Sequence, residues 1–116
     1  MIHIIIPGTP VSVNHYLGNC VQGRRVVRYK TKKAKDYQKL CSTLYDHKTL
    51  DGDLKMTIHL YFGDKRRRDV DNYNKSILDA FQGYIYKDDS QIKELTIIKK
   101  EKDKENPRVE VFVEAL

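Results

Sequence analysis

The residues best suited to chemistry lie between positions 66 and 75. This segment contains three consecutive arginines, two aspartates spaced two apart and a lysine: Arg66, Arg67, Arg68, Asp69, Asp71 and Lys75. A second acidic pair, Asp88 and Asp89, follows further along the chain. Guanidinium groups bind phosphate oxygens through paired hydrogen bonds, and carboxylates are ligands that Mg²⁺ prefers. Their combination predicts metal-assisted chemistry on the phosphates of a nucleic acid.

The spacing of Asp69 and Asp71 restricts the backbone that carries them. Residues i and i+2 lie on different faces of a helix but point the same way from extended backbone. We therefore expect an extended approach to Asp69 and a helix that begins close to Asp71. Lys75 would then lie one turn further on the Asp71 face, and Asp79 one turn beyond it. The simpler alternative is that one aspartate caps the helix, which leaves the second unexplained.

Hydrophobic periodicity predicts the elements around this segment. Residues 54–62 alternate apolar and polar side chains, which is typical of a strand with one buried face. Residues 2–6 form a continuous apolar run, which predicts a strand buried on both faces. Thr31 is expected to cap a helix that runs to about His47. A second helix is expected to end at Gly83.

The remaining elements complete a mixed α/β, or α+β, domain. Residues 20–21 and 26–27 predict a short basic hairpin, and residues 92–99 and 108–114 predict two strands. The charged segment between these two strands is expected to be the solvated tip of a hairpin. The order β, small hairpin, α, β, α, β, β predicts a mixed β-sheet with two α-helices packed on it.

Length and charge indicate a single domain, residues 1–116, with an anionic partner. The chain has 116 residues, of which 40% are hydrophobic, and its net charge is +6. This length is sufficient for one modest core, and the positive charge favours binding to nucleic acid. Lys and Arg are concentrated between Arg24 and Lys39, where Asp36 is the only acid.

Cysteine usage and the N-terminus indicate the compartment. Cys20 and Cys41 are the only cysteines, and no spacing typical of zinc sites surrounds them. Two free thiols are typical of a reducing cytoplasm. The apolar run at the N-terminus stops at Pro7, which makes it too short for a signal peptide or a membrane span. We therefore expect a cytoplasmic protein with no membrane partner.

These residues resemble a known enzyme family. The similar segments are Arg66-Arg67-Arg68-Asp69-Val70-Asp71-Asn72, Lys75, Asp79-Ala80 and Asp88-Asp89-Ser90-Gln91-Ile92. They resemble the RusA family of Holliday junction resolvases, which are small endodeoxyribonucleases of bacteria and their prophages. The stretch Pro10-Val11-Ser12-Val13-Asn14 is more weakly similar, and the residues from Cys20 to Tyr29 match poorly.

The resemblance implies a RusA-like fold and a homodimer that acts in DNA recombination and repair. The dimer would bind four-way DNA junctions and nick two strands symmetrically with magnesium. The catalytic carboxylates would be Asp69, Asp71 and Asp89, and the essential lysine would be Lys75.

The chemistry of phosphodiester hydrolysis is consistent with these assignments. Mg²⁺, for which Mn²⁺ is a possible substitute, can generate the nucleophile and neutralise developing charge. Asp69, Asp71 and Asp89 would supply its oxygen ligands, and Asp88 would be a further ligand or an outer partner. Lys75 would either neutralise phosphate charge or orient the attacking water, and the sequence does not separate these roles.

Several residues outside the acidic cluster are candidates for DNA binding. The three arginines at 66–68 are expected to contact DNA phosphates. An electropositive track is expected to extend this surface through Arg24, Arg25, Arg28 and Lys30. Asn14 is a further candidate for DNA binding, from the weaker similarity. Tyr16 and Tyr29 are candidates for stacking on DNA, whereas Tyr37, Tyr45, Tyr73 and Tyr84 fall at helical core spacing. The alternative for the basic region is a solvated hairpin and helix face.

Three other functions are compatible with parts of this pattern. A less selective structure-specific DNA nuclease would use the same site on other DNA shapes. A non-catalytic nucleic-acid-binding module would use the acids only to cap a helix and balance the arginines. A calcium-stabilised domain is disfavoured because the chain has no EF-hand spacing.

Overall fold

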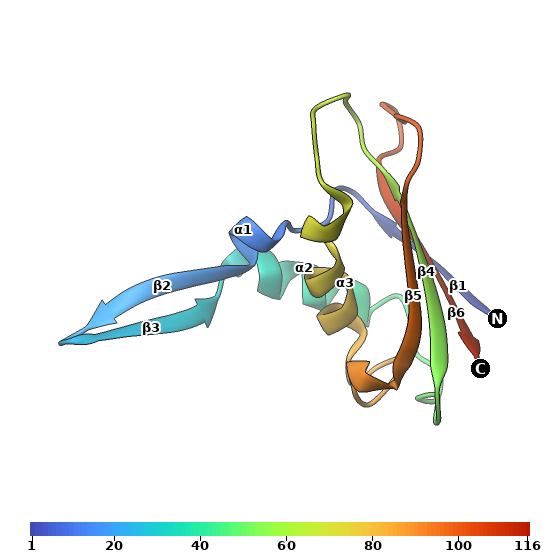
Figure 1. The fold of residues 1–116 in the computed structure, drawn as a ribbon, viewed down its shortest axis with the longest axis horizontal. Helices are drawn as coiled ribbons and strands as arrows, with labels where there is room; N and C mark the ends of the chain where they lie inside the picture. The colour runs from blue at the N-terminus through green and yellow to red at the C-terminus, as the bar shows by residue number, and fades with distance from the viewer.

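The computed structural model describes residues 1–116 and contains one four-stranded sheet with helices on one side of it (Figure 1). The strands are β1 (Ile2–Pro7), β4 (Leu54–Tyr61), β5 (Ile92–Lys99) and β6 (Arg108–Ala115). Their spatial order is β1-β6-β4-β5, in which β4 is parallel to β5 and the other pairs are antiparallel. The predicted mixed sheet within an α+β fold is confirmed.

The central strand β4 has one buried and one open face, as its alternation predicts. Leu54, Met56, Ile58 and Leu60 are fully buried. The intervening side chains lie on the opposite face, which no helix covers (Figure 1). This open face also explains a wrong prediction, because β1 is not buried on both sides. Ile4 and Ile6 are buried, whereas Ile5 is 50% exposed.

Helices α2 (Lys32–Ser42) and α3 (Asn74–Phe81) cover the sheet, and the short α1 (Val13–Tyr16) contacts both. Thr31 caps α2 as predicted, because its hydroxyl oxygen accepts a hydrogen bond from the Ala34 backbone N–H. The helix ends at Ser42 rather than at His47. The hydroxyls of Ser42 and Thr43 donate to backbone carbonyls one turn earlier, a bond that competes with continued helix.

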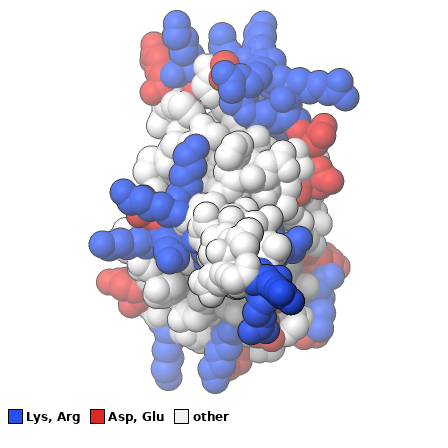
Figure 2. Space-filling model, turned by 90° about the vertical axis from the view of Figure 1, so that its left-hand side faces the viewer, with Lys and Arg blue, Asp and Glu red and all other residues white.

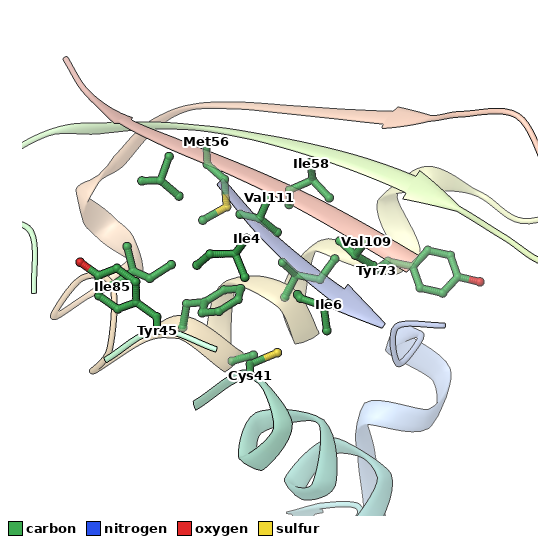
Figure 3. Close-up of a cluster of buried hydrophobic side chains, with 14 of the residues drawn as sticks. Ile4, Ile6, Cys41, Tyr45, Met56, Ile58, Tyr73, Ile85, Val109 and Val111 are labelled. Carbon is green, nitrogen blue, oxygen red and sulfur yellow. The ribbon is translucent and has the colours of Figure 1, made fainter. Parts of the chain in front are cut away.

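The core lies between these helices and the sheet (Figure 3). It joins side chains of the sheet with side chains of the segments that cover it, among them Ile4, Ile6, Cys41, Tyr45, Met56, Ile58, Tyr73, Ile85, Val109 and Val111. Tyr37, Tyr45 and Tyr73 are buried as predicted, but Tyr84 is 42% exposed. Gly83 has a φ of 89°, a value that favours glycine, and it turns the chain before Tyr84.

Strands β2 (Leu17–Gln22) and β3 (Arg25–Lys30) form the predicted basic hairpin, which projects away from the sheet (Figure 1). Its tight turn contains Gly23 at a φ of 64°. No helix lies over its outer part (Figure 1). Three of its cations, Arg24, Arg25 and Arg28, are therefore exposed at a distance from the core.

The connection from β5 to β6 is not a hairpin, which corrects the prediction. The two strands lie on opposite sides of β4, so the linking segment, residues 100–107, passes over the end of β4. The backbone N–H groups of Lys100 and Asp103 donate to the carbonyls of Leu60 and Phe62 at 2.8 Å each. Those carbonyls would otherwise be unpaired at the strand end.

No helix in the structure is both long enough and apolar enough to cross a membrane.

Candidate active site

The two predicted metal ligands of the central motif lie where β4 leads into α3. Asp69 has extended backbone, with φ −87° and ψ 131°, as its spacing predicts. Asp71 lies in the 3-10 turn η1 (Val70–Asn72), and α3 begins only at Asn74, slightly later than predicted. Neither aspartate caps a helix through its side chain. The capping alternative therefore does not explain this pair.

Both carboxylates are available to a cation. Asp69 and Asp71 are exposed, and neither takes part in a salt bridge. One or two carboxylates, together with waters and substrate phosphate, form a common Mg²⁺ site. The donor set at Asp69 and Asp71 therefore fits the metal that the sequence predicts.

The arginine loop, residues 62–69, is shaped by one of its own arginines. Arg68 donates to Asp64 from Nη1 at 2.6 Å and from Nη2 at 3.3 Å. Its guanidinium carbon lies 4.4 Å from the centre of the Phe62 ring. Arg66 and Arg67 are exposed and have no salt bridge, so they remain available to phosphate. The three arginines are therefore not equivalent.

The Asp64 carboxylate organises this loop. Besides Arg68, it accepts a hydrogen bond from the Arg66 backbone N–H at 2.9 Å. The hydrogen bond from Arg68, followed by that from the Arg66 backbone, lowers the pKa of Asp64 to about 2. The carboxylate is consequently charged at neutral pH and holds the loop through charge-assisted hydrogen bonds.

A cleft of about 360 Å³ joins the arginine loop to the N-terminal segment. Its lining includes Ser12, Asn14, Arg66, Arg67, Arg68 and Asp69. A neighbouring cleft of about 580 Å³ shares Ser12, Arg66 and Tyr73 with it and also contains His15 and Lys33. The structure thus brings Asn14 next to the arginines, although they are far apart in sequence.

Sequence reasoning did not identify His15 or Lys33 as neighbours of the arginine loop. Lys33 belongs to the basic run that the sequence makes visible. No sequence signal distinguishes His15, because its place in the cleft depends on how α1 docks against the other helices.

Lys75 lies on the exposed side of α3 and pairs with Asp79. The Lys75 Nζ is 3.4 Å from Asp79 Oδ2. The same carboxylate oxygen accepts a hydrogen bond of 2.6 Å from the Tyr16 hydroxyl. Tyr16 is only 1% exposed, so the prediction that it stacks on DNA is wrong. Tyr29, the other candidate, is 47% exposed on the basic hairpin.

The second acidic pair lies at the opposite end of α3 from Asp69. Asp88 accepts from the Ser90 backbone N–H at 3.4 Å and forms a capping box with Gln91 at the 3-10 turn η2 (Asp89–Gln91). The backbone N–H of Asp89 lies 3.4 Å from the side-chain oxygen of Gln82, which follows the last residue of α3. The eight residues of α3 span about 12 Å, which separates the second acidic pair from Asp69. Through its capping box, Asp88 has a local structural role that the sequence did not predict.

The pKa of Asp89 is shifted by burial and by nearby charges. Partial burial and then the adjacent carboxyl of Asp88 raise the pKa of Asp89, and the charge of Asp79 acts in the same direction. The ammonium group of Lys75 opposes this rise. The charges of Asp79 and Lys75 thus act on the Asp89 carboxyl in opposite directions. Within one chain, no three His, Cys, Asp or Glu side chains are close enough together to hold a metal ion, so the four predicted ligands do not converge.

The fold and the arginine–aspartate loop define a small α+β protein with the features of a nuclease. Residues 7–114, nearly the whole chain, match the family described as Endodeoxyribonuclease RusA. The chain belongs to this family, whose members are endodeoxyribonucleases that resolve Holliday junctions. The predicted family membership is therefore confirmed.

A shorter match relates the chain to the "Uncharacterized protein YqaN" of Bacillus subtilis (strain 168). The two are 51% identical over 45 residues, which are 39% of this chain and 30% of that protein. The match thus spans less than a third of the curated relative. The name of that relative describes no activity that could be compared with this site.

Proposed function

We propose that the protein is a magnesium-dependent endodeoxyribonuclease that resolves four-way DNA junctions by paired symmetric nicks. It would act in the cytoplasm during DNA recombination and repair. The observation that carries this proposal is that two exposed arginines, Arg66 and Arg67, line one cleft with Asp69. The carboxylates of Asp69 and of nearby Asp71 have no salt bridge. Cations suited to phosphate thus lie near oxygens suited to a metal ion, which supports the proposal.

Within this proposal, Asp69 and Asp71 hold the metal ion, which is Mg²⁺ with Mn²⁺ as a substitute. When bound, the ion supplies a hydroxide nucleophile and neutralises charge on the phosphate. Asp89 is a further catalytic carboxylate that does not share this ion within one chain, and Asp88 forms the capping box beside it.

The cations have separate tasks in binding and chemistry. Arg66 and Arg67 bind the phosphates next to the scissile bond, and Arg68 holds the arginine loop through Asp64. Lys75 neutralises the charge that develops on the phosphate or orients the attacking water, since its side chain is half exposed and its ammonium group lies beside Asp79.

The basic hairpin extends the DNA-binding surface. Figure 2 views the molecule from the side to which the hairpin projects. Lys and Arg form a large group at the top of this face and smaller groups at its left, lower right and bottom, with Asp and Glu mainly at the margins. Arg24, Arg25 and Arg28 are exposed there. Phosphate contacts of this type position DNA without reading its sequence.

The working unit is proposed to be a homodimer. A four-way junction presents two equivalent strands to be cut, and one chain carries a single set of candidate catalytic residues. Two-fold symmetry is the commonest oligomeric arrangement and provides two identical sites. A dimer therefore accounts for paired nicks.

The deciding experiment incubates four-way, nicked and linear DNA with the protein, with and without Mg²⁺, and maps the cut positions. Symmetric paired cuts only in the four-way junction and only with metal support the proposal. Equal cutting of nicked and linear DNA identifies a less selective nuclease. Binding without any cleavage identifies a nucleic-acid-binding module.

A further inference from the structure

Asp79 is held by three other residues, two at its carboxylate and one at its backbone carbonyl. Its Oδ2 accepts the Tyr16 hydroxyl at 2.6 Å and lies 3.4 Å from the Lys75 ammonium nitrogen. The Gln38 side-chain amide donates to the Asp79 backbone carbonyl at 3.3 Å. Residues from α1, α2 and α3 therefore meet at one aspartate, and that aspartate contacts the candidate catalytic lysine.

We propose that Asp79 and Tyr16 are positioning residues that hold Lys75 for DNA cleavage. Tyr16 fixes the carboxylate, and the carboxylate in turn fixes the ammonium group. This inference rests on the proposed nuclease function and adds residues to it. Neither residue would touch the DNA or the metal ion.

The ion pair between Lys75 and Asp79 differs from an ordinary ion pair on the protein surface. Lysine has a long flexible side chain, and exposed pairs at positions i and i+4 are individually weak because both partners remain mobile. Here the acceptor is preorganised, since Asp79 is only 20% exposed and its partner Tyr16 is 1% exposed. A fixed acceptor restricts the range of positions that the Lys75 ammonium group visits.

The Tyr16 hydroxyl is suited to holding the Asp79 carboxylate in one position. Burial, followed by the hydrogen bond to Asp79, raises the pKa of Tyr16 above its ordinary value. The hydroxyl therefore keeps its proton and remains a donor throughout the physiological range. A hydrogen bond from a neutral hydroxyl to a carboxylate is charge-assisted and short, which agrees with the observed 2.6 Å.

Tyr16 also connects this network to the basic hairpin. It is the last residue of α1 and directly precedes β2. The Thr31 backbone N–H, just after β3, donates to the Tyr16 carbonyl at 3.1 Å. The ammonium groups of Lys30 and Lys75 lie 5.9 Å and 5.5 Å from the centre of the Tyr16 ring. Tyr16 thus joins the base of the hairpin, through its backbone carbonyl, to the surroundings of the candidate lysine, through its ring and hydroxyl.

The test compares Asp79→Asn and Tyr16→Phe with two matched controls. Asp103→Asn removes a carboxylate that pairs with Arg108 at 2.7 Å in the segment over the end of β4. Tyr45→Phe removes a tyrosine hydroxyl that donates to the Lys48 carbonyl at 2.7 Å. Each control loses the same chemical group in a similar contact, but away from Lys75.

Two quantities are measured for each variant. The first is the single-turnover cleavage rate of a four-way junction, alongside the Kd for that junction without metal. The second is the NMR signal of the Lys75 side chain in protein that contains isotope-labelled lysine. This signal is identified by its absence from the spectrum of the Lys75→Arg variant. Thermal unfolding identifies any variant that fails to fold.

A positioning role predicts that Asp79→Asn slows cleavage by about 10-fold or more while the Kd changes less than about 2-fold, because small misplacements of reacting groups are costly. Tyr16→Phe should slow cleavage less, and the double variant should be no slower than Asp79→Asn alone, because the two residues act in series. The Lys75 signal should shift in both variants and in neither control.

An unchanged cleavage rate and an unchanged Lys75 signal in Asp79→Asn would overturn the inference, as would equal losses of rate in the controls. If the wild-type protein cuts no DNA, the proposed function fails. The Lys75 signal then decides alone whether Asp79 and Tyr16 hold the lysine. If Asp79→Asn does not fold, Tyr16→Phe gives the same two readouts, and an unchanged rate and signal in it overturn the inference.

Discussion

The guanidinium group of Arg68 is paired with the carboxylate of Asp64, four residues earlier in the chain, at 2.6 Å and 3.3 Å. Only 14% of the Arg68 side chain is exposed, because it also lies on the Phe62 ring. One of the three consecutive arginines therefore stabilises the loop that presents the other two. This division of roles leads to the first two predictions.

Replacing Arg68 with Gln should raise the pKa of Asp64 from about 2 towards its ordinary value of 3.8. Because the folded-state pKa is depressed, the contact contributes its full stabilisation above pH 3.8 and loses it as the pH falls through about 2. Titration of the Asp64 carboxyl carbon by NMR measures the change. An identical Asp64 titration in wild type and Arg68→Gln would show that the pair does not form in solution.

Replacing Arg66 and Arg67 together with Ala should weaken DNA binding and flatten its salt dependence. Each lost phosphate contact lowers the slope of log Kd against log salt by about one unit. The matched control is Lys102 and Lys104 replaced together with Ala, in the exposed segment over the end of β4. Equal slopes for the two double variants would mean that the arginines make no special phosphate contact.

Replacing Asp71 with Asn should abolish nearly all cleavage and retain the fold and junction binding. The change preserves size but removes the charge that a metal ion requires, and loss of one such group costs about 100-fold or more in rate. Asp69→Asn should behave in the same way, because Asp69 is the other proposed ligand of the same ion. Cleavage assays with circular dichroism and binding controls test this, and near-normal nicking by Asp71→Asn would remove that residue from the site.

Mixing wild-type chains with Asp71→Asn chains should give heterodimers that nick one strand and do not complete resolution. The reason is that each chain of the proposed dimer supplies one set of catalytic residues. Sedimentation and strand-specific mapping of the cuts measure assembly and outcome together. A monomer that makes paired symmetric cuts at working concentration would exclude the dimer.

Local sequence determined much of the fold and part of the candidate site. The alternation along β4, the Thr31 cap, the basic hairpin and the extended backbone at Asp69 all follow from interactions between near neighbours in the chain. These were predictable because propensity, capping and side-chain alternation act over a few residues. The chemical types within residues 66–75 were also sufficient to indicate phosphate and a metal ion.

The tertiary structure decided the features that depend on distant contacts. The parallel pairing of β5 with β4 separates β5 from β6, and one sheet face remains open, which exposes Ile5. Docking of α1 against α3 buries Tyr16 on Asp79. The packing also places Asp89 beside Gln82, just after the end of α3, instead of beside Asp69. No spacing in the sequence encodes these distances, because they result from how whole elements pack around the shared core.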